Sequence, residues 1–466
     1  MSWTTNITTH NGDSAETNEA TCIRPYLLIC TTAASGHFYP TLQIAEHLIK
    51  QGFEATVIAA EHSRRQVERA GARHVALPPF IPSLEAMEEC KQLTTGFQKM
   101  VWGLTHVVVK RIPDYHAVVV GTLEALRSEQ PGQQIVILMD LISGAANPLL
   151  HGAPLPRGFA ERPPVLAYNV VPLALPGVDV GPFGLGLPPD STESGRARNR
   201  LLHEAYMQPG GVFGSFCREY GRVMEALGAA APATDAVTAM TTCPDITLQT
   251  CSPSLELPRS DLPDKVRFIG CLPSKTPDPA FEYPEWWGDV NSPGPNRRKI
   301  IGVAQGTVAV KYNDLIIPVI QGLRDRDDVF VVAVLGVKGA SLPAEVEIPT
   351  NTKVVDFMPY EALLPHLDVW VINAGYGGFT QGVMHGVPMV FSGDTEDKAE
   401  VSMRGQWAGV GYNLRTASPT PEQVAQGVDR VLEDHEYKAR VIEIRKENEA
   451  LKSLQAVEKY IWDLVS

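Results

Sequence analysis

The stretch "WVINAGYGGFTQGVMHGVPMVFSGDTEDKAE", residues 370–400, contains the pattern that decides the fold. A short apolar run leads into a glycine-rich turn, a short helical pattern follows, and a second apolar run ends on an acidic cluster. Glycines let backbone amides approach an anion, and a helix that begins near Gly377 would add its positive end, equivalent to roughly half a charge. The stretch therefore predicts a diphosphate-binding turn. Gly375, Gly377 and Gly378 would serve an ordinary strand-to-helix turn equally well.

The same alternation of strand and helix patterns extends outward from this stretch in both directions. In the first half, "YLLICT" is typical of a buried strand, "TAASGHFY" of a loop, and "PTLQIAEHLIKQG" of a helix with Pro40 in its first turn and Gly52 after its end. Further strands are predicted at "FEATVIAA", "QQIVILMD", "KIIGVA", "VFVVAVLG", "TKVVDF", "VWVIN" and "PMVFS". Repeated units of this kind imply an α/β protein with doubly wound parallel sheets.

Chain length and irregular stretches divide the sequence into parts. A chain of 466 residues is too long for one ordinary core. We expect a disordered tail over 1–22, an N-terminal domain over 23–270, a proline-rich linker over 271–298, a C-terminal domain over 299–450, and a helix over 451–466 that packs back on the first domain. The Gly- and Pro-rich segment 176–194 is predicted to be a long surface loop, with a lid over a ligand as one reading.

Composition narrows the class of partner. The net charge of -13 argues against nucleic acid as the main partner, since nucleic acid selects clustered Lys and Arg, and favours a small molecule. The apolar runs are far shorter than the roughly 20 residues of a membrane helix, so no transmembrane anchor is expected. Seven scattered cysteines fit a reducing compartment, and the polar N-terminus lacks the apolar core of a secretion signal. A cytoplasmic protein is therefore expected.

Polar residues follow the predicted strands, where the carboxyl ends of a parallel sheet form a ligand crevice. His37 follows the first strand and Asp140 ends another, so both would face the same crevice. An imidazole paired with a carboxylate can take a proton from a hydroxyl near neutral pH. His37 as a helix-capping loop residue and Asp140 as a turn residue is the alternative. The one DxD match, Asp325 to Asp327, precedes a strand and indicates a solvated turn, so no metal is expected.

Two blocks, "SGHFYPTLQIAEHLIKQGFEATVIAA" and "VVDFMPYEALLPHLDVWVINAGYGGFTQGVMHGVPMVFSGDTEDKAE", resemble the family-1 UDP-glycosyltransferases of the small-molecule or natural-product type. The resemblance runs from about residue 26 to the C-terminus and is loose between about 150 and 265. It implies the GT-B fold, in which two Rossmann-like domains face a central cleft. The N-terminal domain would then bind the acceptor and the C-terminal domain the nucleotide sugar.

The resemblance also implies roles for individual residues. His37 looks like the general base and Asp140 like the acid paired with it. Thr307, after Gly306, matches the small hydroxyl residue that reaches the diphosphate. Phe357 stands where an aromatic side chain stacks on uracil, with Met358 and Tyr360 near the same base. The amides of 374–379, which include those of Tyr376 and Phe379, would receive the leaving diphosphate.

Several positions depart from the family pattern. Asn373 replaces a phosphate-binding histidine, Gly378 a serine or threonine, and Gln381 a glutamate that holds both ribose hydroxyls. Asp397 and Lys398 match an Asp-Gln pair that holds the sugar, with lysine for glutamine. The lost charges are worth typically about 1 kcal/mol or somewhat more per contact, so weaker or altered donor use is expected.

The sequence thus predicts an inverting, metal-independent transfer of a hexose, with glucose as the first expectation, from a UDP-sugar to a hydroxyl of a small, largely apolar acceptor. Two alternatives remain at this point. A sugar-nucleotide epimerase can share the same fold, and a non-catalytic binding subunit would be consistent with the altered Asn373 and Gln381.

Overall fold

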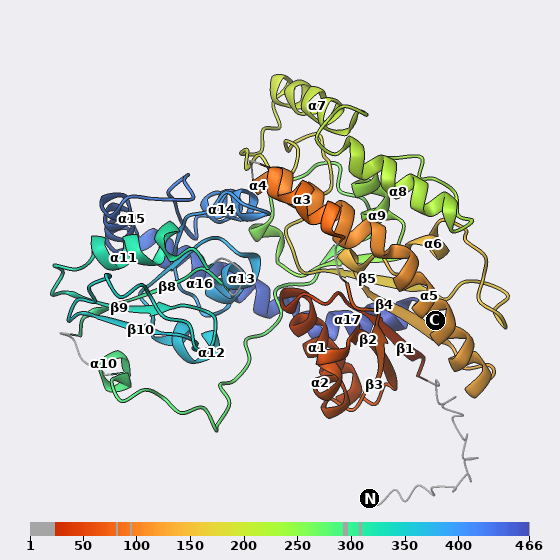
Figure 1. Ribbon diagram of the computed structural model, residues 1–466, viewed down its shortest axis with the longest axis horizontal. Helices are drawn as coiled ribbons and strands as arrows, with labels where there is room; N and C mark the ends of the chain where they lie inside the picture. Colours follow the sequence, from red (N-terminus) through yellow and green to blue (C-terminus); the bar gives the residue numbers. More distant parts are fainter. Residues whose placement is uncertain (1–23, 81–82, 94–95, 292–296, 307–309, 466) are drawn as a thin grey trace, which may run out of the picture.

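Two parallel β-sheets, each covered by helices on both faces, form two lobes of the molecule (Figure 1). The structure is a computed structural model and describes residues 24–80, 83–93, 96–291, 297–306 and 310–465. The predicted tail over 1–22 and Thr307 lie outside the described residues. The doubly wound parallel architecture confirms the predicted α/β class.

The N-terminal lobe contains a seven-stranded sheet in the order β3-β2-β1-β4-β5-β6-β7. Strand order reverses between β1 and β4, which pair in parallel with Cys30 opposite Met139. Its strands are β1 Tyr26–Cys30, β2 Ala55–Ala60, β3 Arg73–Leu77, β4 Ile135–Asp140, β5 Val165–Asn169, β6 Ile246–Gln249 and β7 Val266–Phe268. Its helices are α1 Ser35–Lys50, α2 Arg64–Arg69, α3 Leu84–Gln92, α4 Gly96–Gly103, α5 Ile112–Glu129, α6 Asn147–Leu150, α7 Glu193–Met207, α8 Gly214–Ala226 and α9 Ala236–Thr242.

The C-terminal lobe contains a six-stranded sheet in the order β10-β9-β8-β11-β12-β13, with its reversal between β8 and β11. The strands are β8 Lys299–Ala304, β9 Val329–Val334, β10 Thr352–Val355, β11 Val369–Ile372, β12 Met389–Phe391 and β13 Gly411–Asn413. The helices from the linker onward are α10 Trp287–Asn291, α11 Ile316–Gly322, α12 Tyr360–Leu363, α13 Tyr376–Met384, α14 Lys398–Trp407, α15 Pro421–Glu433, α16 His435–Leu451 and α17 Ser453–Asp463.

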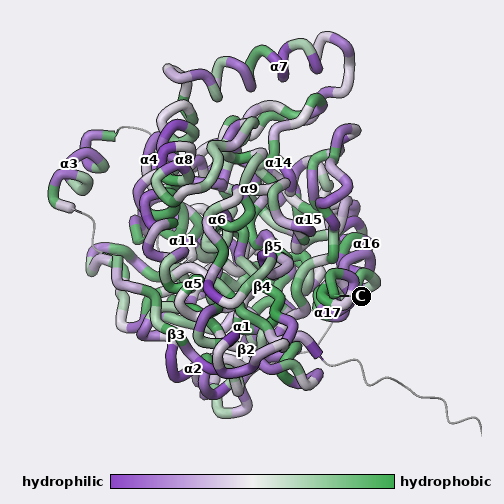
Figure 2. The backbone as a smooth tube through the Cα atoms, turned by 90° about the vertical axis from the view of Figure 1, so that its right-hand side faces the viewer, coloured by the Kyte–Doolittle hydropathy of each residue, from purple (hydrophilic) through white to green (hydrophobic). Residues whose placement is uncertain are grey.

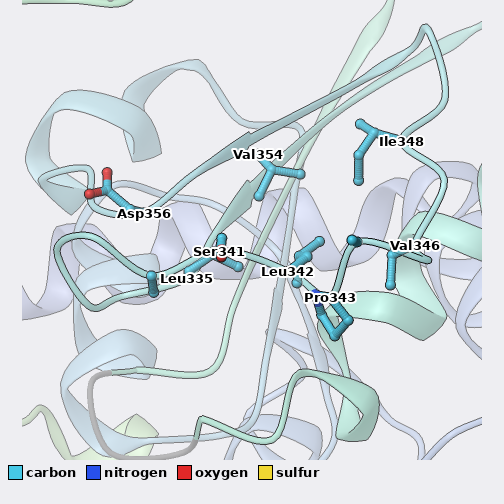
Figure 3. Close-up of a pocket in the computed structure, with 10 residues that line it drawn as sticks. Leu335, Ser341, Leu342, Pro343, Val346, Ile348, Val354 and Asp356 are labelled. Carbon is cyan, nitrogen blue, oxygen red and sulfur yellow. The ribbon is translucent and has the colours of Figure 1, made fainter.

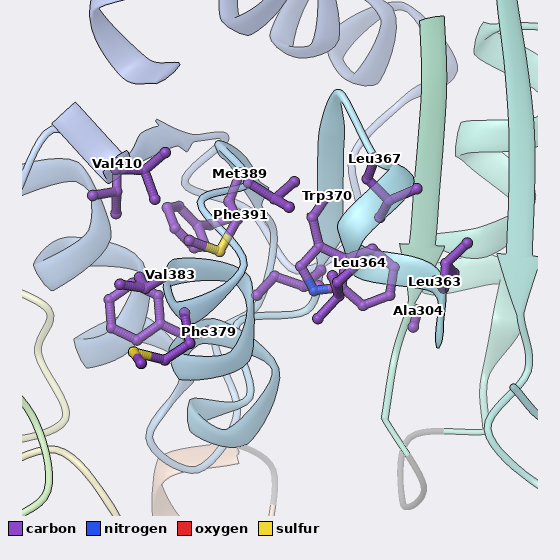
Figure 4. Packing of buried hydrophobic residues seen from close by; sticks show 14 of the residues in the cluster. Ala304, Leu363, Leu364, Leu367, Trp370, Phe379, Val383, Met389, Phe391 and Val410 are labelled. Carbon is purple, nitrogen blue, oxygen red and sulfur yellow. The ribbon is translucent and has the colours of Figure 1, made fainter. Parts of the chain in front are cut away.

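The central strands of each sheet are buried on both faces, which explains why they are nearly continuous apolar runs, whereas the edge strands β3, β7 and β10 carry polar residues such as Arg73, Arg267 and Lys353. In the C-terminal lobe, Trp370 of β11 is fully buried among leucines that follow α12 and among side chains of α13 and β12 (Figure 4). Hydrophobic residues concentrate in the central strands, while hydrophilic stretches such as α2 lie at the periphery (Figure 2). In the described part of the chain, no helix is long and apolar enough to cross a membrane.

One local prediction needs correction. The loop predicted before Pro40 is helical from Ser35, so Pro40 lies inside α1 and His37 in its first turn. Pro40 cannot donate to the Gly36 carbonyl one turn earlier, and α1 continues because its apolar face, with Phe38, Leu42 and Ala45, is packed in the core. Within the span 451–466, where a C-terminal helix was expected, α17 covers Ser453–Asp463, and Lys452, which has a left-handed backbone with φ 50°, separates it from α16.

The C-terminal helices join the two lobes. α17 lies against the N-terminal sheet, and its Val457 and Ile461 belong to the same core cluster as Leu48 of α1 (Figure 1). In α16, the buried Asn448 accepts hydrogen bonds from the backbone N–H groups of Ser252 and Cys271, at 2.9 and 2.8 Å. These contacts hold the end of the chain on the first lobe.

Candidate active site

His37 and Asp140 lie side by side at the carboxyl end of the N-terminal sheet. Nδ1 of His37 is 2.9 Å from Oδ2 of Asp140, and the Asp140 side chain is fully buried. Neither atom has another hydrogen-bond partner among the described residues. Burial by itself would lower the pKa of His37, but the charge and hydrogen bonding of Asp140, with a contribution from Asp397, raise that pKa above its ordinary value. The pairing through Nδ1 leaves Nε2 as the ring atom that can take up a proton.

The glycine-rich turn after β11 has the backbone of an anion cradle. Ala374 adopts a left-handed conformation with φ 61°, which is rare for a residue with a Cβ and is found at functional turns. Asn373 fixes this turn, because its Nδ2 donates to the Gln305 carbonyl at 2.6 Å and its Oδ1 accepts from the Gly375 N–H at 3.4 Å. α13 begins immediately afterwards with no side-chain cap, so its first N–H groups point out of the helix end.

Two glycines at this helix end have open space where a side chain would begin. A Cβ added to Gly377 would meet no heavy atom within 4 Å, and one added to Gly378 would come no nearer than 3.9 Å to Trp370 Nε1. The side chains of Tyr376 and Phe379 instead lie in the core cluster, so these two residues offer only their backbone N–H groups to the cradle. Gln381 is half-buried one turn further along the same helix, next to Gly378 on its surface.

The loop after β10 presents one exposed aromatic side chain. Phe357 is 41% exposed, while Met358 lies in the core and Tyr360 packs edge-on against Trp370. Of the three residues assigned to the uracil, only Phe357 therefore has an available ring. Asp356 holds the loop by accepting from the N–H groups of Gly339 and Phe357, both at 2.7 Å.

Two features border Phe357 that the sequence did not indicate. The Lys338 ammonium lies 5.2 Å from the centre of the Phe357 ring, a cation–π contact. Beside Asp356 lies a mainly apolar pocket of about 350 Å³ (Figure 3). Its lining comes from the segment 335–348 together with Val354 and Asp356.

The loop after β12 brings Asp397 toward the N-terminal lobe. Burial raises the pKa of Asp397 to about 6; the charges of His37 and Arg404 oppose this shift, and that of Glu400 adds to it. Asp397 and His37 thus interact electrostatically across the lobes. Lys398 is folded back onto its own loop, where its ammonium donates to Thr395 Oγ1 at 2.6 Å and to the Glu396 carboxylate.

The positive charge of Lys398 is weakened by its surroundings. Burial lowers the pKa of Lys398 to about 8, with Asp394 acting in the opposite direction. The structure brings together His37, Asp140 and Asp397, and the turn 373–378 belongs to the same lobe as Asp397. Within the described residues, no group of three or more His, Cys, Asp or Glu side chains could hold a metal ion.

Beside Gly378, the buried indole N–H of Trp370 has no acceptor, and this gives a testable prediction. Trp370 Nε1 is buried without a hydrogen-bond partner, and the hydroxyl of a serine introduced in place of Gly378 would come within its reach. The variant Gly378→Ser is expected to raise the free energy of unfolding by about 1 kcal/mol, from better helix propensity and one recovered hydrogen bond. The matched control Gly377→Ser gains only the propensity, because no polar group lies near its Cβ. Urea unfolding that shows equal gains for both variants would contradict this account.

The arrangement of two facing Rossmann-like domains with a His-Asp pair opposite a glycine-rich turn defines a GT-B glycosyltransferase. Residues 322–464 match the family described as erythromycin biosynthesis protein CIII-like, C-terminal domain. UDP-glucosyltransferase 1 of Beauveria bassiana is 39% identical over 439 residues, covering 93% of this chain and 94% of that protein. UDP-glucosyltransferase A1 of Starmerella bombicola is 31% identical, and the match covers 95% of this chain and 93% of that protein.

Solved structures share the fold. The glycosyltransferase of kitacinnamycin has a TM-score of 0.68 at 20% identity, covering 95% of this chain and 99% of its own. The calicheamicin glycosyltransferase CalG4 has a TM-score of 0.63 at 15% identity, and the match covers 95% of this chain and 98% of that protein. The chain belongs to the UDP-glycosyltransferases. It is an enzyme that moves a glycosyl group from a UDP-sugar to a small-molecule acceptor.

Proposed function

We propose that this enzyme transfers glucose from UDP-glucose to a hydroxyl of a small, largely apolar acceptor, with inversion at the anomeric carbon. The observation that carries the proposal is the 2.9 Å contact between His37 Nδ1 and the buried Asp140, with Asp397 of the other lobe facing the same imidazole. Glucose is favoured because relatives that align over most of the chain are named UDP-glucosyltransferases.

Proton transfer from the acceptor is the role of His37. Nε2 takes the proton of the acceptor hydroxyl as its oxygen forms a bond to the anomeric carbon, and the bond from that carbon to the diphosphate oxygen breaks. Asp140 holds the imidazole in the tautomer with hydrogen on Nδ1 and stabilises the imidazolium. Inversion follows from the geometry proposed, since the base lies on one lobe and the diphosphate cradle on the other, on opposite faces of the sugar.

The leaving UDP is received by the second lobe. The N–H groups at the start of α13 and the turn around Ala374 stabilise the negative charge that develops on the diphosphate, with no metal needed. Phe357 stacks on uracil, Gln381 accepts from the ribose, and Asp397 accepts from hydroxyls of the sugar. Lys398 stabilises the loop between β12 and α14, called here the sugar loop, by donating to Thr395 and Glu396. These contacts explain how a lysine is accommodated at this position.

The direct test is incubation with several UDP-sugars and a panel of phenols, with mass spectrometry of the products. A mass gain of one hexose with UDP-glucose, together with a β-configured anomeric proton in the product NMR spectrum, is the expected result. Hydrolysis or epimerisation of the UDP-sugar without any transfer, or an α-configured product, would refute the proposal.

The pKa of Asp397 predicts how donor use depends on pH. Its carboxylate accepts from sugar hydroxyls only when ionised, and its pKa is raised to about 6. The Michaelis constant for UDP-glucose is therefore expected to rise as the pH falls through about 6, while kcat falls as His37 becomes protonated. In Asp397→Asn the Michaelis constant is expected to be higher and nearly independent of pH. A wild-type Michaelis constant that stays flat below pH about 6 would contradict the assignment of Asp397.

A further inference from the structure

Three buried charged side chains connect the two lobes beside the sugar loop. Arg404 of α14 lies between two glutamates. Its Nη2 is 2.6 Å from Oε1 of Glu256 in the N-terminal lobe, and its Nη1 is 2.6 Å from Oε2 of Glu400 in its own helix. The Arg404 Nη2 also donates to the Leu173 carbonyl at 3.0 Å. All three side chains are at most 6% exposed. Charges this deeply buried need several partners, and here the partners come from both lobes.

Glu400 also binds a loop of the opposite lobe. Its Oε1 accepts from the N–H groups of Gly184 and Gly186, at 2.8 and 2.9 Å. These glycines belong to the segment 182–187, within the stretch predicted as a long loop. A Cβ on Gly186 would lie 2.8 Å from the Ala399 carbonyl oxygen, and one on Gly184 would overlap the Phe97 ring of α4. The segment 182–187 is therefore wedged between α4 and α14, with Glu400 as its polar anchor.

The same helix begins at the sugar loop. Asp397 is the residue before α14, and its carbonyl accepts the first helical hydrogen bond, from Val401 N–H at 3.0 Å. Glu400 follows three residues later, so Asp397 and Glu400 lie on neighbouring positions of the first turn. Glu396, just before it, has φ 48°, a strained conformation that persists only when its surroundings hold it. The first turn of α14 thus needs an anchor outside its own loop.

We propose that Glu400 is a positioning residue for sugar transfer. By binding Gly184 and Gly186 with one oxygen and Arg404 with the other, it fixes the first turn of α14 against the N-terminal lobe. This fixes the Asp397 carboxylate at the distance from His37 that a bound sugar requires. The inference rests on the proposed role of Asp397. In this account, the segment 182–187 fixes the position of the C-terminal lobe relative to the N-terminal lobe.

The test compares Glu400→Ala with the matched variant Glu256→Ala. Both remove one buried carboxylate from Arg404, but only Glu400 contacts the segment 182–187 and the first turn of α14. For Glu400→Ala we expect a higher Michaelis constant for UDP-glucose and a kcat lower by on the order of tenfold to a hundredfold, as for a small misplacement of a reacting group. The affinity for UDP alone, measured by calorimetry, is expected to be unchanged, because the cradle at 373–378 is untouched. Glu256→Ala is expected to lose stability with a smaller loss of kcat.

Glu400→Gln provides a milder version of the same test. Its single carbonyl oxygen cannot accept from the glycine N–H groups and from Arg404 together, so kcat is expected to fall part of the way. Its pH profile gives a second readout: the rise of the Michaelis constant for UDP-glucose at acid pH moves to lower pH, since the negative charge of Glu400 contributes to the raised pKa of Asp397. A structural role alone would not change the pH at which the Michaelis constant rises.

Two results would overturn the inference. One is a Glu400→Gln enzyme with wild-type kcat, Michaelis constant and pH profile; the other is an equal loss of kcat in Glu400→Ala and Glu256→Ala, which would point to charge balance around Arg404. The wild-type enzyme is assayed in parallel with the UDP-sugar panel, which tests the proposed donor independently of the role of Glu400. The variants are then assayed with the UDP-sugar that the wild type turns over.

Discussion

Replacing His37 with alanine is expected to lower kcat for glycosyl transfer on the order of a thousandfold, within the range that a positioned general base contributes. The reason is geometric. The Nδ1 of His37 is held 2.9 Å from the buried Asp140, which leaves Nε2 to take up the proton, and Asp397 of the other lobe acts electrostatically on the same imidazole. Without it, the acceptor hydroxyl would have to attack with its proton still attached.

Binding and chemistry are separated by measuring both in the same variant. UDP affinity should not change in His37→Ala, because the diphosphate cradle belongs to the other lobe. The exposed His62, replaced by alanine, is a matched control and should retain full activity. If His37→Ala kept wild-type kcat with normal donor binding, the base would have to be another residue.

The strands β1, β2, β4 and β8 to β12 were predictable because parallel strands buried on both faces are short continuous apolar runs, whereas β3, β5, β6, β7 and β13 were not predicted. "KIIGVA" and "VFVVAV" coincide with β8 and β9. The start of α1 was not predictable, because Pro40 usually marks a first turn and here lies inside the helix. The weak strand β7, three residues long, has too little pattern to be recognised and forms because β6 provides a hydrogen-bonding edge.

The candidate site was predictable to the extent that it lies at strand ends. His37, Asp140 and the turn 373–378 follow β1, β4 and β11, and the topology alone brings such positions together. Glu400 and Arg404 were not predictable, because charged residues four apart on a helix are most often a solvated pair. Only the packing of the opposite lobe, through Glu256 and the segment 182–187, buries them.

The direction of individual side chains was also beyond the sequence. Tyr376 belongs to the cradle by position, yet its hydroxyl accepts from Gln249 of the N-terminal sheet at 3.3 Å. Met358 and Phe379 also have their side chains in the core and not at the ligand site. A motif fixes where the backbone runs, whereas tertiary packing decides which side chains remain available to a ligand.

Replacing Arg404 with methionine is expected to reduce the free energy of unfolding by about 3–5 kcal/mol, the cost of leaving buried charges without a partner. Arg404 is 1% exposed and is the shared counter-ion of Glu256 and Glu400, at 2.6 Å from each. Methionine fills a similar volume, so the loss comes from two uncompensated carboxylates and not from a cavity. Urea unfolding followed by circular dichroism measures the change. Arg64→Met removes a pair with Glu61 at the surface and should unfold close to the wild type.

A triple variant distinguishes charge from packing as the cause of this loss. Glu256→Gln and Glu400→Gln added to Arg404→Met remove the charges together, while each amide oxygen still accepts from backbone N–H groups that the two glutamates bind now, such as those of Leu257 and Gly184. Replacing a buried ion network by neutral residues of similar volume is often neutral or stabilising, so the triple variant should be more stable than Arg404→Met alone. A triple variant as unstable as the single one would mean that the shape of the arginine, and not its charge, holds the lobes together.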